Sequence, residues 1–436
     1  MPPRSAPRKR ARLVGCEHFV RHNPRSDRFE TLGFHHLELL CGDAKTAAAH
    51  FCTALGLRPI ALSSMMTGNL TYASHVVASG DVKLAFTAPY GDGAAAAAAH
   101  QREGLPHRAF KPEEARAAFA AHGMHVSAVG IHVSDAARAF DAAVEGGAFP
   151  LAEPFVDDKT GVCISEVRLY PDGDVRLRFV SGAHLSELPF LPGYRDLRDA
   201  EGVAAAGKYG IERVDHVVGN VKDLLSTVDY IVGFTGFHEF AEFTAADVGT
   251  VDSGLNSMVL ASNNERVLLP INEPTSGGKR KSQILTYLEQ HGGPGVQHIA
   301  LKTNDVFATV AAMRAAHAAC GGFELMDRPR ESYYDNLVDR IGADALTPSQ
   351  VAQCRELGIL ADRDDQGILL QIFTKPVGDR STLFVEIIQR IGCTHDPATN
   401  KEIEQSPGCG GFGKGNFHEL FRAIEEYETR AGINKL

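Results

Sequence analysis

The sequence lacks any run of apolar residues long enough to cross a bilayer, and it lacks the apolar core of a signal peptide. We therefore expect a soluble cytoplasmic protein with no membrane partner. Positive charge is also scarce, because 44 Lys and Arg stand against 54 Asp and Glu and the net charge is -10. Proteins that bind nucleic acid need concentrated positive charge to displace counterions, so we expect no nucleic-acid partner.

The one basic stretch is residues 4–12 at the N-terminus. We interpret it as a solvated tail. A fragment of a plastid transit peptide is the alternative, although the stretch lacks the extended serine-rich, acid-free character of such peptides.

Cysteines are few, and no Cys-x-x-Cys pair occurs among the eight at positions 16, 41, 52, 163, 320, 354, 393 and 409. This scatter predicts reduced thiols rather than a disulfide framework or a zinc site.

What the sequence does contain is a fourfold repeat. Four segments begin with an apolar strand and run through a turn into a helix: residues 33–40, 127–133, 213–220 and 296–301. An Asp follows each strand where a helix N-cap is wanted, at positions 43, 135, 223 and 305. Each unit closes with a short β-like run, at residues 82–86, 175–179, 266–271 and 383–388.

These repeats predict an α+β fold with two domains, each made of paired βαβββ modules that form a half-open barrel. We expect a tail over residues 1–30, an N-terminal domain for packing and subunit contacts over 31–187, and an exposed linker over 188–210. The catalytic domain is expected over 211–436 and ends in a gating helix. Two insertions interrupt the repeat, residues 91–114 as a surface loop or short helix, and residues 330–363 beside the cavity or at an oligomer contact.

Placed in register, the modules carry metal-binding side chains mainly in the C-terminal pair. The first-strand position holds His36, Ala128, His216 and His298, and the last-strand position holds Ala85, Arg178, Pro270 and Glu386. Two histidines and one carboxylate bind one face of an octahedral metal and leave positions for substrate and O2, as in non-haem Fe(II) oxygenases. We therefore predict Fe(II) at His216, His298 and Glu386.

A single histidine on an apolar strand is usually a core residue, and we interpret His36 in that way. A carboxylate between Val385 and Ile387 is harder to explain as structure alone, because burying it without a partner is costly.

Further polar and aromatic residues of the C-terminal half are candidates for substrate contacts. They are Ser257, Asn272, Gln283, Gln297, Gln371 and Phe373. Gln371 and Phe373 alternate on one predicted strand and should point the same way. The glycine-dense residues 408–417 lack the Walker spacing of a phosphate loop, so we favour a hinge before the amphipathic stretch 418–430.

Four motifs in the C-terminal half are similar to those of the 4-hydroxyphenylpyruvate dioxygenases of the plant type. They are Val296-Gln-His-Ile-Ala-Leu, Ile368-Leu-Leu-Gln-Ile-Phe-Thr-Lys-Pro, Leu383-Phe-Val-Glu-Ile-Ile-Gln-Arg and Gly410-Gly-Phe-Gly-Lys-Gly-Asn-Phe. The resemblance covers nearly the whole chain after residue 30. It implies the vicinal-oxygen-chelate fold, a homodimer, and conversion of 4-hydroxyphenylpyruvate and O2 to homogentisate and CO2 in tyrosine and phenylalanine catabolism.

The resemblance also assigns roles to residues. His216, His298 and Glu386 match the iron ligands, and Gln283, Gln297 and Gln371 would orient the substrate. The positions that match substrate contacts are Ser257, Asn272, Gln283, Gln297, Gln371, Phe373, Phe384, Phe412, Asn416 and Phe417.

Three alternatives remain open on the sequence. A hydroxymandelate synthase uses the same substrate but oxidises its benzylic carbon. An extradiol catechol dioxygenase shares the triad without decarboxylation. A non-catalytic binding module of the same repeat type would bind ligands without consuming O2.

Overall fold

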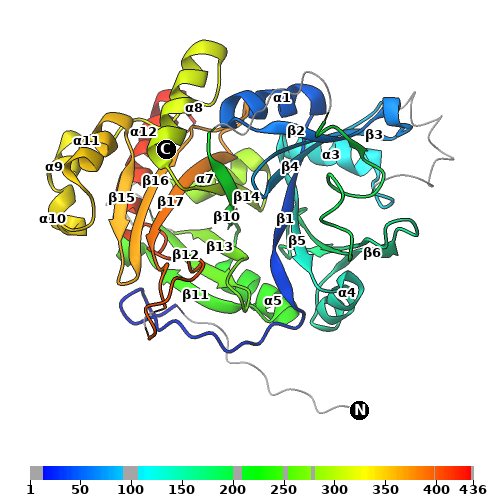
Figure 1. The fold of residues 1–436 in the computed structure, drawn as a ribbon, viewed down its shortest axis with the longest axis horizontal. Helices are drawn as coiled ribbons and strands as arrows, with labels where there is room; N and C mark the ends of the chain where they lie inside the picture. Colours follow the sequence, from blue (N-terminus) through cyan, green and yellow to red (C-terminus); the bar gives the residue numbers. More distant parts are fainter. Residues whose placement is uncertain are drawn as a thin grey trace.

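The computed structural model describes residues 13–91, 107–199, 209–248, 254–275, 280–396 and 398–433, and the expectations for residues 4–12 and 94–99 lie outside them. The strands form two sheets that lie side by side, with the first sheet built from the N-terminal half and the second from the C-terminal half (Figure 1).

Each sheet contains two βαβββ modules. The first module is β1 (Thr31–Leu40), α1 (Ala44–Leu55), β2 (Arg58–Ser63), β3 (Tyr72–Ser79) and β4 (Val82–Pro89). The second is β5 (His125–Val133), α4 (Ala136–Glu145), β6 (Pro150–Val156), β7 (Cys163–Arg168) and β8 (Arg176–Ser181). The third is β10 (Ile211–Asn220), α5 (Leu224–Thr235), β11 (His238–Phe243), β12 (Leu255–Ala261) and β13 (Leu268–Pro274). The fourth is β14 (Gly295–Thr303), α8 (Val306–Cys320), β15 (Leu360–Arg363), β16 (Gly367–Phe373) and β17 (Phe384–Gly392).

The two sheets have the same scheme of strand pairing. The first has the order β6-β7-β8-β5-β1-β4-β3-β2-β9, where β9 is the short strand Arg195–Asp196, and the second has the order β11-β12-β13-β10-β14-β17-β16-β15. In each, two first strands pair antiparallel at the centre, and each pairs in parallel with the last strand of its own module. The predicted fold of paired modules is confirmed.

The predicted N-caps are also confirmed. The side chains of Asp43, Asp135, Asp223 and Asp305 each accept a hydrogen bond from a backbone N–H in the first turn of α1, α4, α5 and α8. A carboxylate at this position satisfies an otherwise unpaired donor and favours the positive end of the helix dipole.

The helices of the modules meet between the two sheets. Helix α1 packs against α8, and α4 packs against α5, so that one large apolar cluster extends through both halves. The side of the second sheet away from these helices is therefore free to form a cavity, which the C-terminal helix α12 (Phe417–Ala431) covers.

Additional elements surround this frame. They are η1 (Met65–Thr67), α3 (Pro112–His122), α6 (Ala245–Val248), α7 (Gln283–His291), α9 (Glu331–Asp335), α10 (Leu337–Ile341), α11 (Pro348–Leu357) and η2 (Lys414–Asn416). Helices α9 to α11 belong to the insertion 330–363, and Tyr333 from α9 donates a hydrogen bond to Asn416 beside the cavity (2.8 Å). No helix of the described chain combines the length and apolarity needed to cross a membrane.

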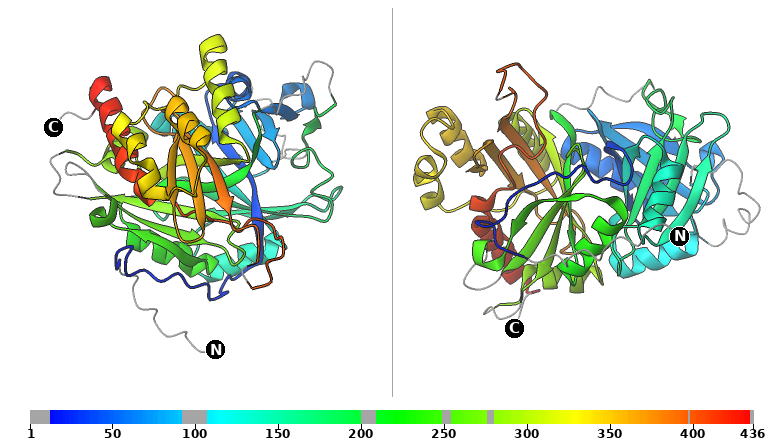
Figure 2. Two further views of the ribbon diagram at one scale, coloured as in Figure 1. Left: turned by 60° about the vertical axis from the view of Figure 1, so that its left-hand side comes forward. Right: turned by 90° about the horizontal axis from the view of Figure 1, so that it is seen from below.

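Two segments that the repeat pattern leaves out are held against the frame. Residues 13–30 run along the second half of the molecule (Figure 2), where Val14 and Gly15 donate backbone hydrogen bonds to Glu242. In the segment expected to be an exposed linker, Phe190 and Leu191 are buried, and β9 pairs with β2. The prediction of an exposed linker is therefore wrong for these residues, because their apolar side chains fill the N-terminal half-barrel.

An arginine fills the place in the N-terminal half-barrel that repeats Glu386. The guanidinium of Arg178 contacts Glu38 (2.6 Å), Glu166 (2.7 Å) and His36 (2.9 Å), and all four residues are buried. The positive charge that balances the two carboxylates is thus the guanidinium of Arg178. His36 is a core residue in this cluster.

The prediction that all eight cysteines are reduced is wrong for two of them. Cys393 and Cys409 form a disulfide, whereas the other six are free. The chain leaves β17, turns and returns beside its end, which brings two cysteines 16 residues apart to a Cα–Cα distance of 6.1 Å. Neither cysteine carries a spacing motif, so this close approach depends on loop geometry that the sequence pattern does not reveal.

Candidate active site

Three neighbouring strands bring the predicted metal ligands together. His216 lies on β10, His298 on β14 and Glu386 on β17. In the register of the sheet, Ala300 of β14 pairs with both His216 and Glu386, so those two residues share one row. His298 lies two residues before Ala300, and because strands alternate with a period of two, its side chain points to the same face.

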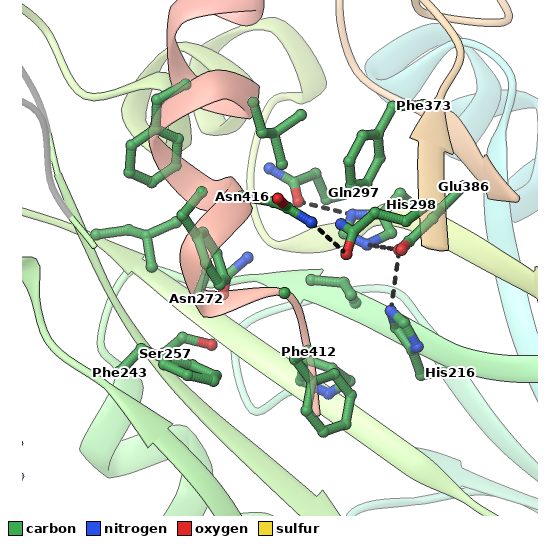
Figure 3. A pocket seen from close by; sticks show the side chains of 18 of the residues that line it. His216, Phe243, Ser257, Asn272, Gln297, His298, Phe373, Glu386, Phe412 and Asn416 are labelled. Atoms are coloured by element: carbon green, nitrogen blue, oxygen red, sulfur yellow. Dashed lines mark hydrogen bonds and ion pairs between the residues drawn. The ribbon is translucent and has the colours of Figure 1, made fainter. Parts of the chain in front are cut away.

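The donor atoms of the three side chains converge. Nε2 of His216 lies 3.2 Å from Oε2 of Glu386, and Nε2 of His298 lies 3.3 Å from the same oxygen (Figure 3). All three residues are buried, and their donor atoms lie within 4.8 Å of one another. Among the described residues, this is the one group with the composition and spacing to hold a metal ion.

The outer nitrogens of both imidazoles face oxygen acceptors. Nδ1 of His216 lies 2.9 Å from the carboxylate of Asp215, and Nδ1 of His298 lies 2.9 Å from the amide oxygen of Gln297. An Nδ1–H that donates to these oxygens leaves each Nε2 lone pair directed at the shared centre. This is the tautomer that metal coordination requires.

The carboxylate of Glu386 is anionic at neutral pH. Burial by itself would raise its pKa, but the two facing imidazoles outweigh burial and hold the pKa at about 2. When the protons on the two facing imidazole nitrogens are lost, the carboxylate and these nitrogens make a buried, electron-rich centre that needs another cation in their place. This donor set fits a divalent first-row metal and leaves further coordination positions open.

A cavity opens next to the triad, with about 590 Å³ of empty space when the solvent at its mouth is included. All the expected site residues line it except Phe384: His216, His298, Glu386, Ser257, Asn272, Gln283, Gln297, Gln371, Phe373, Phe412, Asn416 and Phe417. Phe384 lies behind the wall instead, where its ring stacks on the imidazole of His298 with centroids 4.8 Å apart.

Polar side chains lie on several sides of the cavity. Ser257 of β12 and Asn272 of β13 are paired in register and therefore face the same way. The Oε1 atom of Gln283, at the start of α7, is buried without a hydrogen-bond partner in the described chain. A buried acceptor left without a donor is costly, so this atom indicates where a ligand donor belongs.

The C-terminal segment closes the cavity on the remaining side. Asn416 lies 3.5 Å from Oε1 of Gln371, and Gly413 lies so close to Gln371 that a Cβ there would come within 2.2 Å of its amide oxygen. Gly413 also has a φ of +72°, which favours glycine. The glycines of this segment thus permit close packing against β16.

Sequence reasoning missed part of the site. Besides Pro270, which the repeat register already placed at the site, other apolar residues complete the lining: Val218, Phe243, Leu255, Val259, Leu420, Phe421 and Ile424. Leu420, Phe421 and Ile424 share one face of α12, and their helical spacing in the sequence could have identified them. No sequence signal distinguishes Phe243 from an ordinary core residue.

Comparison with known proteins defines the class first. The family model of the Glyoxalase/Bleomycin resistance protein/Dioxygenase superfamily matches residues 33–162 and 213–371, which contain nearly all of the first and third modules and the leading parts of the second and fourth, without β7, β8 and β17. A mutant of 4-hydroxymandelate synthase from Streptomyces coelicolor has a similar structure, with a TM-score of 0.71 and 24% identity over 92% of this chain and 99% of that one. At that identity, the similarity shows the fold.

Closer relatives define the family within this class. The chain is 54% identical to 4-hydroxyphenylpyruvate dioxygenase of Hordeum vulgare, over 94% of this chain and 91% of that protein. It is 51% identical to 4-hydroxyphenylpyruvate dioxygenase of Arabidopsis thaliana, over 98% of this chain and 94% of that protein. The chain belongs to the 4-hydroxyphenylpyruvate dioxygenase family, and it is a dioxygenase.

Proposed function

We propose that this enzyme converts 4-hydroxyphenylpyruvate and O2 to homogentisate and CO2, with Fe(II) held by His216, His298 and Glu386. The observation that carries the proposal is the convergence of two imidazole nitrogens and one carboxylate oxygen in the wall of the cavity. Relatives at 51–54% identity over nearly the full chain support the substrate.

Fe(II), when bound, would supply the activation of O2 and the transfer of electrons that amino-acid side chains do not provide. The substrate is a 2-oxo acid and loses its carboxyl group as CO2, so it provides the electrons for the reduction of O2. No nicotinamide or second oxo acid is needed.

The protein would bind and orient the substrate. The unpaired Oε1 of Gln283 can accept a hydrogen bond from the phenol, and Gln297 and Gln371 offer amide groups nearby. Phe373 and Phe417 would contact the aromatic ring, for which offset or edge-to-face packing is favourable. The other proposed substrate contacts are Ser257, Asn272, Phe412 and Asn416, and Phe384 would act through His298.

Exclusion of water is the task we assign to the C-terminal helix. Leu420, Phe421 and Ile424 of α12 form an apolar cover over the cavity. Such a cover would protect reactive species from solvent during turnover, and it would have to open for product release.

Product analysis tests the proposal. The protein is loaded anaerobically with Fe(II), mixed with 4-hydroxyphenylpyruvate and O2, and the O2 consumed, CO2 released and organic product are measured. One homogentisate and one CO2 per O2 are expected. Hydroxymandelate would identify a synthase with the same metal site, and turnover of a catechol without CO2 an extradiol dioxygenase. Ligand binding without O2 uptake would identify a binding module.

We also propose the division into domains and the assembly. Residues 31–187 and 211–436 would be two domains joined by 188–210 and preceded by 1–30, which agrees with the two sheets. The family resemblance favours a homodimer, which light scattering would test. For the cellular location we propose the cytoplasm, with a plastid as the alternative, and cell fractionation would test it. The six free cysteines agree with a reducing compartment, whereas the disulfide of Cys393 and Cys409 does not.

A further inference from the structure

Behind the metal ligands, an ion pair is removed from solvent. Arg390 of β17 and Asp215 of β10 have fully buried side chains, and the guanidinium binds the carboxylate twice, through Nη2 to Oδ1 (2.7 Å) and through Nε to Oδ2 (3.0 Å). Neither residue lines the cavity. Their strands are not neighbours, because β14 lies between them.

One end of this pair reaches a metal ligand. Oδ1 of Asp215, which accepts from Nη2 of Arg390, also lies 2.9 Å from Nδ1 of His216. The register of β10 against β14 shifts between Val214 and His216. A shift of this kind lets consecutive side chains reach one side of a strand, and it explains how Asp215 can lie beside the imidazole of His216.

The other end reaches the segment that closes the cavity. Nη1 of Arg390 donates hydrogen bonds to the carbonyl oxygens of Cys409 (2.6 Å) and Gly411 (2.7 Å). Its guanidinium also lies 5.6 Å from the ring centre of Phe412, which is in turn 5.3 Å from that of His216. The planar guanidinium of Arg390, with its five donors, therefore contacts both Asp215, which supports the ligand His216, and the segment that closes the cavity.

We propose that Arg390 is a positioning residue that couples metal binding to closure of the cavity by the segment 408–416. It holds Asp215 so that His216 keeps the geometry for a metal, and it holds the carbonyls that place Phe412 and Asn416. A buried ion pair adds little stability over apolar packing, but it does fix a geometry, which agrees with this role. The inference rests on the proposed metal site.

The N-terminal half of the chain provides a matched control. Arg178 is also buried and paired with two carboxylates, Glu38 and Glu166, but it belongs to the N-terminal sheet and its bonding partners are not the proposed metal ligands. Arg178→Lys and Arg390→Lys both keep the charge and lose the fixed, multiple-donor geometry of the guanidinium. Both substitutions should lower thermal stability. Only a loss of Fe(II) affinity and of amide protection in 408–416 that occurs in Arg390→Lys and not in Arg178→Lys indicates a positioning role.

Anaerobic Fe(II) titration and hydrogen exchange test the coupling. Arg390→Lys should weaken Fe(II) binding about 10-fold or more, the range typical for residues that support metal ligands, and speed amide exchange in 408–416. Arg178→Lys should leave both unchanged. If folded Arg390→Lys matches the wild type in both, the inference is overturned while the metal site stands. If the wild type binds no metal, the proposed function fails instead.

A second measurement needs no substitution and remains available if the variants do not fold. In the wild type, Fe(II) should slow exchange of the amides in 408–416 relative to the metal-free protein. Unchanged exchange on saturation with metal would contradict the coupling directly. Substrate is left out of both experiments, so that its own contacts with the segment do not contribute.

Discussion

The imidazole of His298 stacks on the ring of Phe384, with ring centroids 4.8 Å apart and an interplanar angle of 19°. On its other side, Nδ1 of His298 contacts Gln297. The stacking on Phe384 and the contact with Gln297 together fix the orientation of the His298 imidazole. An aromatic residue that does not line the cavity can in this way contribute to the metal site.

Replacing Phe384 by Leu should weaken metal binding. The substitution removes the flat surface that holds His298, so we expect Fe(II) affinity to fall several-fold, with about 1–2 kcal/mol lost in stability from the smaller side chain. Fe(II) titration of the folded variant measures the first effect. Phe179→Leu, a buried Phe of the N-terminal sheet, is the control, and equal metal affinities in the two variants would refute the role of stacking.

Gly413→Ala should impair catalysis more than folding. A Cβ at Gly413 would meet the amide of Gln371, which lines the cavity, so the variant should show a reduced kcat/KM for 4-hydroxyphenylpyruvate. Gly321→Ala is the matched control, because Gly321 has a similar φ of +70° and no atom within 4 Å of an added Cβ. Both should lose roughly 1 kcal/mol from backbone strain, but Gly321→Ala should keep full activity.

The protein should lose stability in acid, partly through His291. Burial lowers the pKa of His291 to about 3, and its ring is stacked between His122 and Tyr287. Between about pH 6.5 and pH 3 the unfolded chain binds a proton that the folded chain does not. Stability therefore rises with pH through this window, by about 1.4 kcal/mol per unit for one such group.

His291→Phe should remove this contribution. We measure the free energy of unfolding by urea at several pH values between 6 and 4. Its slope against pH should be smaller in the variant, by the amount that corresponds to about one proton. At pH 8 the variant should be about 1 kcal/mol less stable, because the carbonyl of Gly293 loses its donor. An unaltered slope in His291→Phe would exclude the histidine as a source.

Differential alkylation should distinguish Cys393 and Cys409 from the other cysteines. In the unfolded, non-reduced protein we expect six alkylated thiols and one disulfide-linked pair of peptides, as the structure shows. Reduction before alkylation should raise the number to eight. Eight alkylated thiols without reduction would show that the pair is not bonded in the purified protein.

Local patterns in the sequence predict most of the fold. The four repeats, their capping aspartates and the strand alternation at Gln371 and Phe373 all depend on neighbouring residues, and the structure agrees with them. The repeat register also brought together His216, His298 and Glu386, because equivalent positions of related modules occupy equivalent places in a sheet.

What could not be predicted depends on contacts between distant segments. Asp215 and Arg390 are 175 positions apart and no motif links one to the other, so their pairing follows only from the order of the strands. The burial of Phe190 and the disulfide of Cys393 likewise depend on how loops return to the sheets. Such tertiary contacts leave no periodic signal in one sequence.

The measurement that tests the central claim most directly is the stoichiometry of Fe(II) bound to the wild type and to Glu386→Gln under anaerobic conditions. The substitution keeps the shape of the side chain and removes the charge that the two imidazoles face. We predict one Fe(II) per wild-type chain, with binding by folded Glu386→Gln weakened at least 100-fold and homogentisate formation lost. Wild-type metal binding and turnover in Glu386→Gln would contradict the account.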